Sequence, residues 1–245
     1  MPELQLITPA WPAPPRVHAY STTRHGGVSA GAYNSLNLAK HVGDDLATVL
    51  RNRALLAKQL PMEPLWLEQV HGCTVVNAAC TCPDAQADAA MARMDYRLCA
   101  VMTADCLPVL FCDVNATAVA AAHAGWRGLA GGVLENTVKS MQVPAETILA
   151  WLGPAISQPA FEVGDEVRNA FLAHSPDAAV AFAPGRETGK WQADLYALAR
   201  QRLAALGITQ VYGGDRCTYR EAETFFSARR DGIQTGRQAS LIWMA

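Results

Sequence analysis

Apolar positions along the chain fall into short runs that predict strands. These runs are rich in small or β-branched residues and are bounded by Gly, Pro, Asp or Asn. We expect strands at residues 17–23, 65–70, 74–78, 98–103, 108–112, 117–123, 147–152, 208–212 and 239–244. The largely apolar run at residues 116–122 has the length of a buried strand and is too short to span a membrane.

The spacing of apolar side chains also predicts four helices. The first begins at Asp44 or Asp45, either of which can cap it, and Pro61 ends it. Its helical spacing is kept by Leu46, Val49, Leu50, Arg53, Ala54 and Ala57. The other helices are expected at residues 128–141, 166–174 and 193–206. Gly131 and Gly132 weaken the first of these at its start, because glycine is a poor helix former.

The order of these elements predicts a mixed α/β (α+β) fold. Helices and strands alternate without a strict βαβ repeat, and no segment has the composition of a linker, a repeat or a low-complexity tract. A proline-rich lead-in at residues 9–15 is incompatible with regular structure. We therefore expect one domain over residues 1–245, with a mixed β-sheet flanked by helices.

Composition and charge narrow the class of protein. Hydrophobic residues make up 51% of the 245 residues and charged residues 17%, which is typical of a globular chain. The 20 basic and 22 acidic residues are scattered, giving a net charge of −2, so neither a nucleic-acid nor a membrane partner is expected. With no signal-like segment, we expect a soluble cytoplasmic monomer.

Seven cysteines are present, an odd number that argues against a disulfide framework. Most are expected to be reduced and buried, where a free cysteine behaves as a small hydrophobic residue. Which of the cysteines is catalytic or binds a metal has to be judged from its position in the predicted fold.

Three residues at predicted strand-to-loop junctions are candidate metal ligands. His71, Cys106 and His123 each lie near Gly or Pro, where side chains of a rigid sheet meet open space. Singly, each is more often a structural residue. Together they form the three-ligand set typical of a catalytic zinc with an open fourth position, and the same donors suit copper but not Mg²⁺. Their long spacing matches no compact zinc finger or ribbon.

Two glycine-rich turns are candidate anion sites. Residues 125–132 run from a strand into a helix, with Arg127 inside the turn, and residues 23–27 place Arg24 beside two glycines. Neither is a recognised phosphate-binding motif, and a plain tight turn explains either equally well. Asp105, next to Cys106, is a candidate general acid/base or an orienting carboxylate, with turn capping as the alternative.

Several strings together resemble the YfiH family. They occur in order at residues 22–29, 35–38, 41–44, 68–72, 103–109, 122–128, 152–156, 161–164 and 217–219. Members of that family are called polyphenol oxidase, purine nucleoside phosphorylase or peptidoglycan editing factor. One departure is Ala228, in Phe-Phe-Ser-Ala-Arg-Arg, where the family usually has Tyr.

The resemblance implies that His71, Cys106 and His123 hold a metal, with zinc expected and copper as the alternative. It also implies phosphorolysis of adenosine, inosine, guanosine and methylthioadenosine, and deamination of adenosine. A zinc-activated water, its pKa brought toward about 7, would attack C6 in deamination. In phosphorolysis, phosphate would attack C1′, with Arg24 and Arg127 orienting its oxygens.

Three other functions remain open. A copper-dependent polyphenol oxidase has a suitable ligand set, but a full multicopper centre needs more histidines than the six in this chain. A cytoplasmic amidase that edits peptidoglycan precursors would use either zinc or Cys106 as nucleophile with His123 as base. A binding module without catalysis is the least favoured, because the ligands cluster at junctions.

Overall fold

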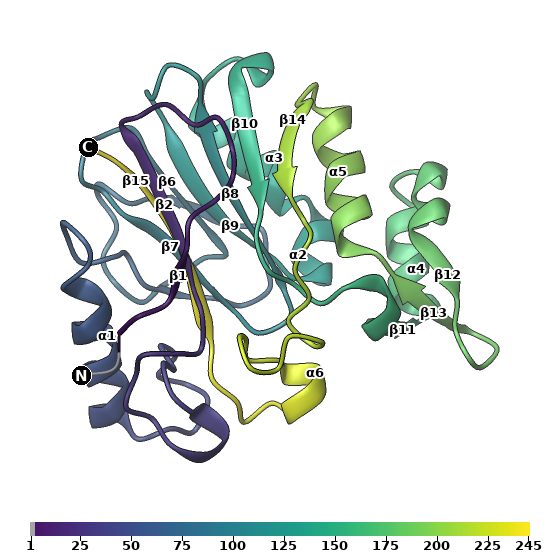
Figure 1. Ribbon diagram of the computed structural model, residues 1–245. Helices are drawn as coiled ribbons and strands as arrows, with labels where there is room; N and C mark the ends of the chain where they lie inside the picture. Colours follow the sequence, from purple (N-terminus) through teal and green to yellow (C-terminus); the bar gives the residue numbers. More distant parts are fainter. Residues whose placement is uncertain (1–2) are drawn as a thin grey trace.

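Two stacked β-sheets form the centre of the molecule. The computed structural model describes residues 3–245. Helices cover the outer face of each sheet, so that four layers follow one another (Figure 1). The mixed α/β class predicted from the sequence is confirmed, although several sheets replace the one expected. No helix within residues 3–245 is long and apolar enough to cross a membrane.

The larger sheet has six strands and mixed direction. Its order is β14 (Gln210–Gly213), β10 (Ile148–Leu152), β8 (Leu107–Asp113), β9 (Val119–Ala124), β6 (Ala89–Ala92) and β4 (Val75–Asn77). The two outer pairs are parallel and the inner pairs antiparallel. Every residue of β8, β9 and β10 is buried, as expected for strands covered on both faces. The apolar run at residues 116–122, predicted to be a buried strand, is confirmed in β9, which contains residues 119–122.

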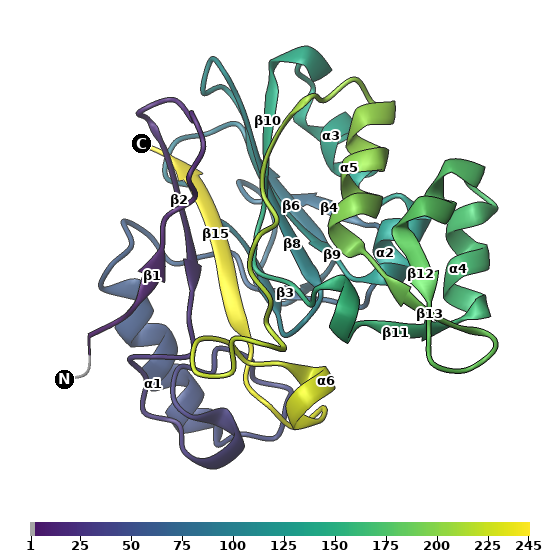
Figure 2. The same cartoon turned by 45° about the vertical axis from the view of Figure 1, so that its right-hand side comes forward.

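The smaller sheet has four antiparallel strands and contains both ends of the described chain. Its order is β1 (Leu6–Ile7), β2 (Val17–Thr22), β15 (Gln238–Met244) and β7 (Cys99–Thr103). Residues 9–15, between β1 and β2, contain no helix or strand, in agreement with their prolines. The C-terminal strand β15 is central, paired with β2 and β7. Figure 2 shows β15 beside β2.

Three apolar clusters hold the layers together. Alternate residues of the six-stranded sheet, such as Val109 and Phe111, pack against helices α3 (Val133–Met141) and α5 (Leu195–Ala205). The intervening residues, such as Leu110, face the four-stranded sheet. The outer face of that second sheet packs against α1 (Leu46–Ala57) through residues such as Leu56.

Two predicted helices differ in detail. In α1, Asp45 is the N-cap, and its side chain accepts a hydrogen bond from the Thr48 amide, as one of the two expected caps. However, Leu46 and Leu50 are 54% and 49% exposed, because the buried face is centred on Val49, Asn52, Arg53 and Leu56.

The helix expected at residues 128–141 is two helices. α2 (Trp126–Gly131) and α3 meet at Gly132, whose φ of 100° lies in the left-handed region that glycine tolerates.

Several short elements were not predicted. These are β1, β6, β5 (Ala85–Gln86), the sheet of β11 (Glu162–Gly164), β13 (Lys190–Ala193) and β12 (Phe182–Pro184), and helix α6 (Ala228–Asp231). These segments are too short for periodicity to identify them.

Three predicted elements are present with shifted bounds. The strand expected at 65–70 is reduced to β3 (Leu67–Glu68), which pairs with β5. The strand expected at 74–78 is β4, and the helix expected at 166–174 is α4 (Asp165–Leu172).

Candidate metal centre

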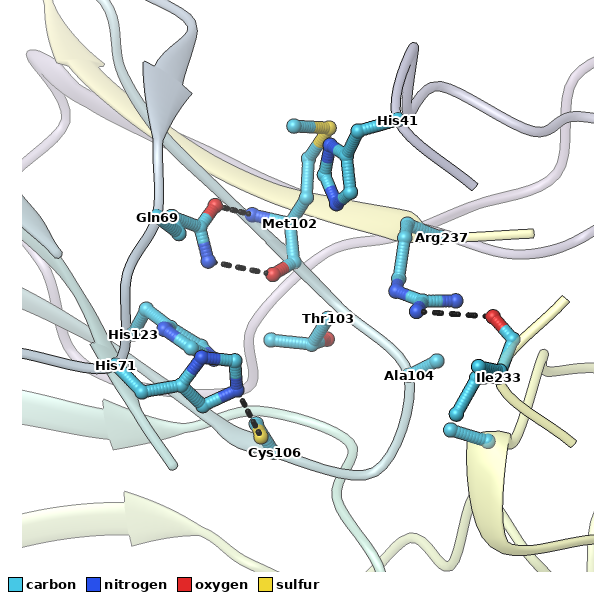
Figure 3. A pocket seen from close by; sticks show the side chains of 11 residues that line it. His41, Gln69, His71, Met102, Thr103, Ala104, Cys106, His123, Ile233 and Arg237 are labelled. Atoms are coloured by element: carbon cyan, nitrogen blue, oxygen red, sulfur yellow. Dashed lines mark hydrogen bonds between the residues drawn. The ribbon is translucent and has the colours of Figure 1, made fainter. Parts of the chain in front are cut away.

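The structure brings His71, Cys106 and His123 to one point. Their potential ligand atoms all lie within 4.8 Å of one another. The Cys106 Sγ is 3.9 Å from Nε2 of His71 (Figure 3). The two imidazole rings are 4.8 Å apart, edge to face at 77°. Two imidazoles and a thiol at this spacing form a group that suits a soft or borderline metal ion.

Strand pairing accounts for the proximity of Cys106 and His123. β8 and β9 are antiparallel, with Leu107 opposite Ala124 and Pro108 opposite His123. Cys106 directly precedes β8, in the turn that follows β7, so this register places it beside His123. The connection from β7 to β8 also carries the chain from the four-stranded to the six-stranded sheet. The candidate site therefore lies where the two sheets meet.

A buried carboxylate holds the third ligand in place. His71 lies in a loop, not at the end of a strand as expected, and has a φ of 59°. Asp88, fully buried just before β6, accepts hydrogen bonds from the amides of His71 at 2.8 Å and Gly72 at 2.6 Å. These bonds fix the loop against the sheet that carries His123.

The same carboxylate orients His123. Its Oδ1 is 2.8 Å from Nδ1 of His123, and both side chains are buried. Burial alone would raise the pKa of Asp88, but the bonds from His123, Gly72 and His71 outweigh it and lower that pKa. An ionised carboxylate only accepts, so it places the ring proton on Nδ1 and leaves Nε2 free for a metal. Asp88 was missed because a lone carboxylate in an alanine-rich segment has no distinctive spacing.

Cys106 and His123 are electrostatically coupled. Burial opposes both charged forms, but the two groups stabilise each other's charge. The pKa of Cys106 falls to about 6, with a further contribution from His71, and that of His123 rises to about 9, with a further contribution from Asp88. Each group therefore favours the charged form of the other, a thiolate beside an imidazolium. Cys99 and Cys112, by contrast, have pKa values raised by burial.

Gly125 allows the backbone to approach the ligands. A Cβ atom at this position would lie 2.9 Å from Cys106 Sγ and 3.0 Å from Cδ2 of His71. Gly125 is also the N-cap residue of α2, with an ordinary extended conformation. The glycine is thus required for the space that it leaves at the cluster.

The three residues line one wall of a cavity of about 270 Å³. Its other lining residues are His41, Gln69, Met102, Thr103, Ala104, Ala228, Ile233 and Arg237 (Figure 3). The side-chain amide of Gln69 is used within the wall, since it exchanges two 2.8 Å hydrogen bonds with the backbone of Met102. Ala228, the residue that departs from the family pattern, contributes only a methyl group to this wall.

Two basic residues of the cavity were not predicted to act there. Arg237, just before β15, donates from Nη1 to the carbonyls of Thr235 and Gly236. The pKa of His41 is lowered by burial and by the positive charges of Arg237 and Arg53. His41 lies in the family-like string at residues 41–44, but an isolated histidine in a loop did not indicate that it lines the cavity.

The two arginines expected to orient phosphate are not among the cavity-lining residues. Arg24 donates to the carbonyls of Asn34 and Ala222, and its guanidinium lies 4.9 Å from the ring centre of Phe226. Arg127 is exposed and stacks on Trp126 at 4.5 Å. Arg127 instead lines a second cavity, together with Lys190 and Arg229.

Asp105 is next to the cavity, but its carboxylate is used elsewhere. Its Oδ1 accepts from the Thr218 hydroxyl and its Oδ2 from the amide of Arg229, both at 2.6 Å. These bonds tie the Cys106 turn to helix α6, which forms part of the cavity wall through Ala228. The hydrogen bonds of the Asp105 carboxylate therefore position the turn that carries Cys106.

Comparisons with known proteins show which family the chain resembles. The family described as multi-copper polyphenol oxidoreductase laccase matches residues 18–245. The chain is 56% identical over 244 residues to purine nucleoside phosphorylase YfiH of Escherichia coli (strain K12), covering 98% of this chain and 99% of that protein. It is 54% identical over 240 residues to purine nucleoside phosphorylase PA4543 of Pseudomonas aeruginosa, covering 97% and 98%.

A more distant relative and a solved structure extend the comparison. Adenosine deaminase RL5, from an unknown prokaryotic organism, is 36% identical over 245 residues, covering 93% of this chain and 94% of that protein. The crystal structure of NMB0706 from Neisseria meningitidis has a TM-score of 0.92 at 56% identity and covers 98% of both chains. The chain therefore belongs to the YfiH family, the family described as multi-copper polyphenol oxidoreductase laccase.

Proposed function

We propose that this chain is a zinc-dependent enzyme of purine nucleosides. Its reactions would be phosphorolysis of adenosine, inosine, guanosine and methylthioadenosine, and deamination of adenosine. The observation that carries the proposal is the cluster of His71, Cys106 and His123 on the wall of a cavity of about 270 Å³. The names of the relatives, purine nucleoside phosphorylase and adenosine deaminase, support the choice of substrate.

The donor set fits zinc. Three protein ligands, one thiol and two imidazoles, lie together with an open cavity on one side, as in catalytic zinc sites. Asp88 supplies the carboxylate that metal-binding histidines commonly use to fix their tautomer. When bound, zinc would supply a Lewis acid and lower the pKa of a coordinated water to about 7.

The chain's own residues bind and orient the substrate. The cavity is slightly below the range of about 300–1,000 Å³ that is typical of small-molecule sites. Its walls therefore hold a nucleoside close to the three ligands, with apolar contacts from Met102, Ala104 and Ala228. In phosphorolysis, a phosphate oxygen bonds to C1′ while the C1′–N9 bond breaks. N9 keeps the electron pair and takes the proton of hydrogen phosphate, so the products are the purine and ribose 1-phosphate, or 5-methylthioribose 1-phosphate from methylthioadenosine.

Metal content measured beside activity tests the proposal. Protein purified without added metal is analysed by plasma mass spectrometry, and then assayed with adenosine and inosine. We expect about one zinc per chain, with deamination and phosphorolysis, and the loss of all three in Cys106→Ala. The exposed cysteine Cys82 provides a matched control, since Cys82→Ala should keep metal and activity. A metal-free Cys106→Ala protein with full activity would overturn the proposal, and copper in place of zinc would favour polyphenol oxidation.

A second candidate is a cysteine amidase that acts on peptidoglycan precursors. It is favoured by the proximity of Cys106 and His123, whose Sγ and ring nitrogen lie within 4.8 Å of one another. This proximity lowers the pKa of Cys106 and raises that of His123. Such a thiolate–imidazolium pair is the usual form of a cysteine nucleophile and its base. Amidase activity that survives chelation but is lost on alkylation of Cys106 would place this candidate first.

A further inference from the structure

The cavity is lined by polar side chains besides the three metal-ligand candidates, among them Arg237, His41 and Thr103. Among the lining residues in the described part of the chain, Arg237 alone has a fixed positive charge, and none is a carboxylate. Figure 3 shows Arg237 and His41 reaching the cavity from the side away from His71 and Cys106. The lining therefore has an excess of positive charge beyond the cluster itself.

The guanidinium of Arg237 is held in place with donors to spare. Nη1 donates to the carbonyls of Thr235 at 2.7 Å and Gly236 at 3.1 Å, while Nη2 is 3.4 Å from that of Ile233. Arginine has five N–H donors. Within residues 3–245, Nε and the second hydrogen of Nη2 have no acceptor. A held arginine with free donors is suited to a ligand with several oxygens, because its rigid fork matches phosphate or carboxylate.

A buried hydroxyl in the same wall provides an independent indication of a ligand. Thr103 is 2% exposed and lines the cavity, yet its Oγ1 has no hydrogen-bond partner among residues 3–245. Buried hydroxyls without a partner are uncommon, because desolvation is then uncompensated. A polar ligand in the cavity would supply the missing hydrogen-bond partner of the Thr103 hydroxyl.

We infer that Arg237, His41 and the Thr103 hydroxyl form the binding site for the phosphate that attacks C1′. The positive charge and the free donors of Arg237 neutralise and orient the phosphate oxygens, and Thr103 and His41 add neutral hydrogen bonds. Arg24 and Arg127, the arginines suggested by the sequence, lie outside the cavity lining. This inference deepens the proposed function, on which its kinetic consequences rest.

Two assays separate the phosphate site from the proposed function. Isothermal titration with inorganic phosphate measures binding whether or not the protein turns over nucleosides. Inosine phosphorolysis gives the KM for phosphate, while adenosine deamination in phosphate-free buffer reports on the rest of the site. The proposed function fails if neither reaction occurs, and the phosphate site is then still tested by titration.

The variants are Arg237→Gln and Thr103→Val. Loss of a charge-assisted interaction should weaken phosphate binding about 10- to 100-fold in Arg237→Gln. Thr103→Val removes only a hydroxyl that has no protein partner, so it should fold normally and weaken binding about 3- to 10-fold. Where activity is present, the KM for phosphate should rise in parallel with the loss of phosphate binding. Thr103→Ser, which keeps the hydroxyl, should bind phosphate like the parent.

Phosphate binding that is unchanged in both Arg237→Gln and Thr103→Val would overturn the inference. Loss of that binding in Arg127→Gln would then place the phosphate elsewhere, and loss in metal-free protein would place it on the metal alone. If Arg237→Gln disturbs the loop whose carbonyls it binds, Thr103→Val decides the question.

Discussion

The carboxylate of Asp88 links two histidines that lie on different parts of the chain. It accepts from the amides of His71 and Gly72 and from the ring of His123. The first two bonds place one ligand, and the third sets the tautomer of the other. A single buried side chain thus sets the relative position of two of the three candidate ligands.

Replacement of Asp88 by asparagine should weaken metal binding while leaving the fold intact. An asparagine amide can donate to Nδ1 of His123, which moves the ring proton to Nε2, the nitrogen that the metal needs. Loss of a carboxylate that supports a histidine ligand typically costs about 10- to 100-fold in metal affinity. Competition with a chromophoric chelator measures this change.

Asp113 provides a control for the loss of a buried carboxylate. It is 1% exposed and accepts hydrogen bonds from the amides of Thr117 and Ala118, in the β8–β9 turn. Asp113→Asn should lower stability but keep metal affinity. Equal losses of metal affinity in Asp88→Asn and Asp113→Asn would show that the effect is one of stability alone.

At the scale of elements, the antiparallel register of β8 and β9 brings Cys106 beside His123. Helix α2 begins directly after β9, at the N-cap residue Gly125. The helix start therefore passes close beneath the ligand cluster, and only a residue without a Cβ fits there.

Gly125→Ala should abolish metal binding without unfolding the protein. The new Cβ would lie 2.9 Å from Cys106 Sγ and 3.0 Å from His71 Cδ2, so the ligands have to separate. The extended backbone at this residue accepts alanine without strain. Metal content and a thermal melt test this expectation.

The control for this change is Gly207→Ala. Gly207 has a φ of 84°, and no other side chain or backbone segment lies within 4 Å of the position that a Cβ would take. Alanine there should cost about 1 kcal/mol through backbone strain and leave the metal bound. Normal metal content in Gly125→Ala would show that the cluster has more room than its geometry indicates.

Across the whole molecule, the three ligands come from two loops and one strand. His71 lies between β3 and β4, Cys106 between β7 and β8, and His123 near the end of β9. A metal bound to all three joins segments that otherwise meet only by packing and hydrogen bonds. It should stabilise the native state, since the unfolded chain does not hold the ligands together.

Removal of the metal should therefore lower the melting temperature. Free metal at 1,000 times its Kd contributes about 4 kcal/mol, and for a chain of this size 1 kcal/mol corresponds to about 2–4 °C. Scanning fluorimetry with and without a chelator should show a shift of roughly 8–16 °C. Cys106→Ala should show no such shift, and an equal chelator response in that variant would indicate a metal bound elsewhere.

Local sequence patterns determined the main elements and the types of ligand. Predicted strands correspond to β2, β4, β7, β8, β9, β10, β14 and β15, and in part to β3. The predicted cap and the spacing of apolar residues account for α1, and the spacing of apolar residues accounts for α5. These features depend on neighbours along the chain, and so can be recognised from it. His71, Cys106 and His123 were recognised as potential ligands because the sequence predicted each at a strand-to-loop junction near Gly or Pro, although His71 lies within a loop.

Only the tertiary structure decided how the parts of the site meet. Asp88 directly precedes β6 and Arg237 directly precedes β15, and these strands belong to different sheets. Only the packing of the two sheets shows that both residues belong to the candidate site. The exposure of Leu46 and the division of the helix at Gly132 likewise depend on what packs around them. Spacing along a chain does not encode which strand lies beside which, because pairing and packing join residues that are far apart in sequence.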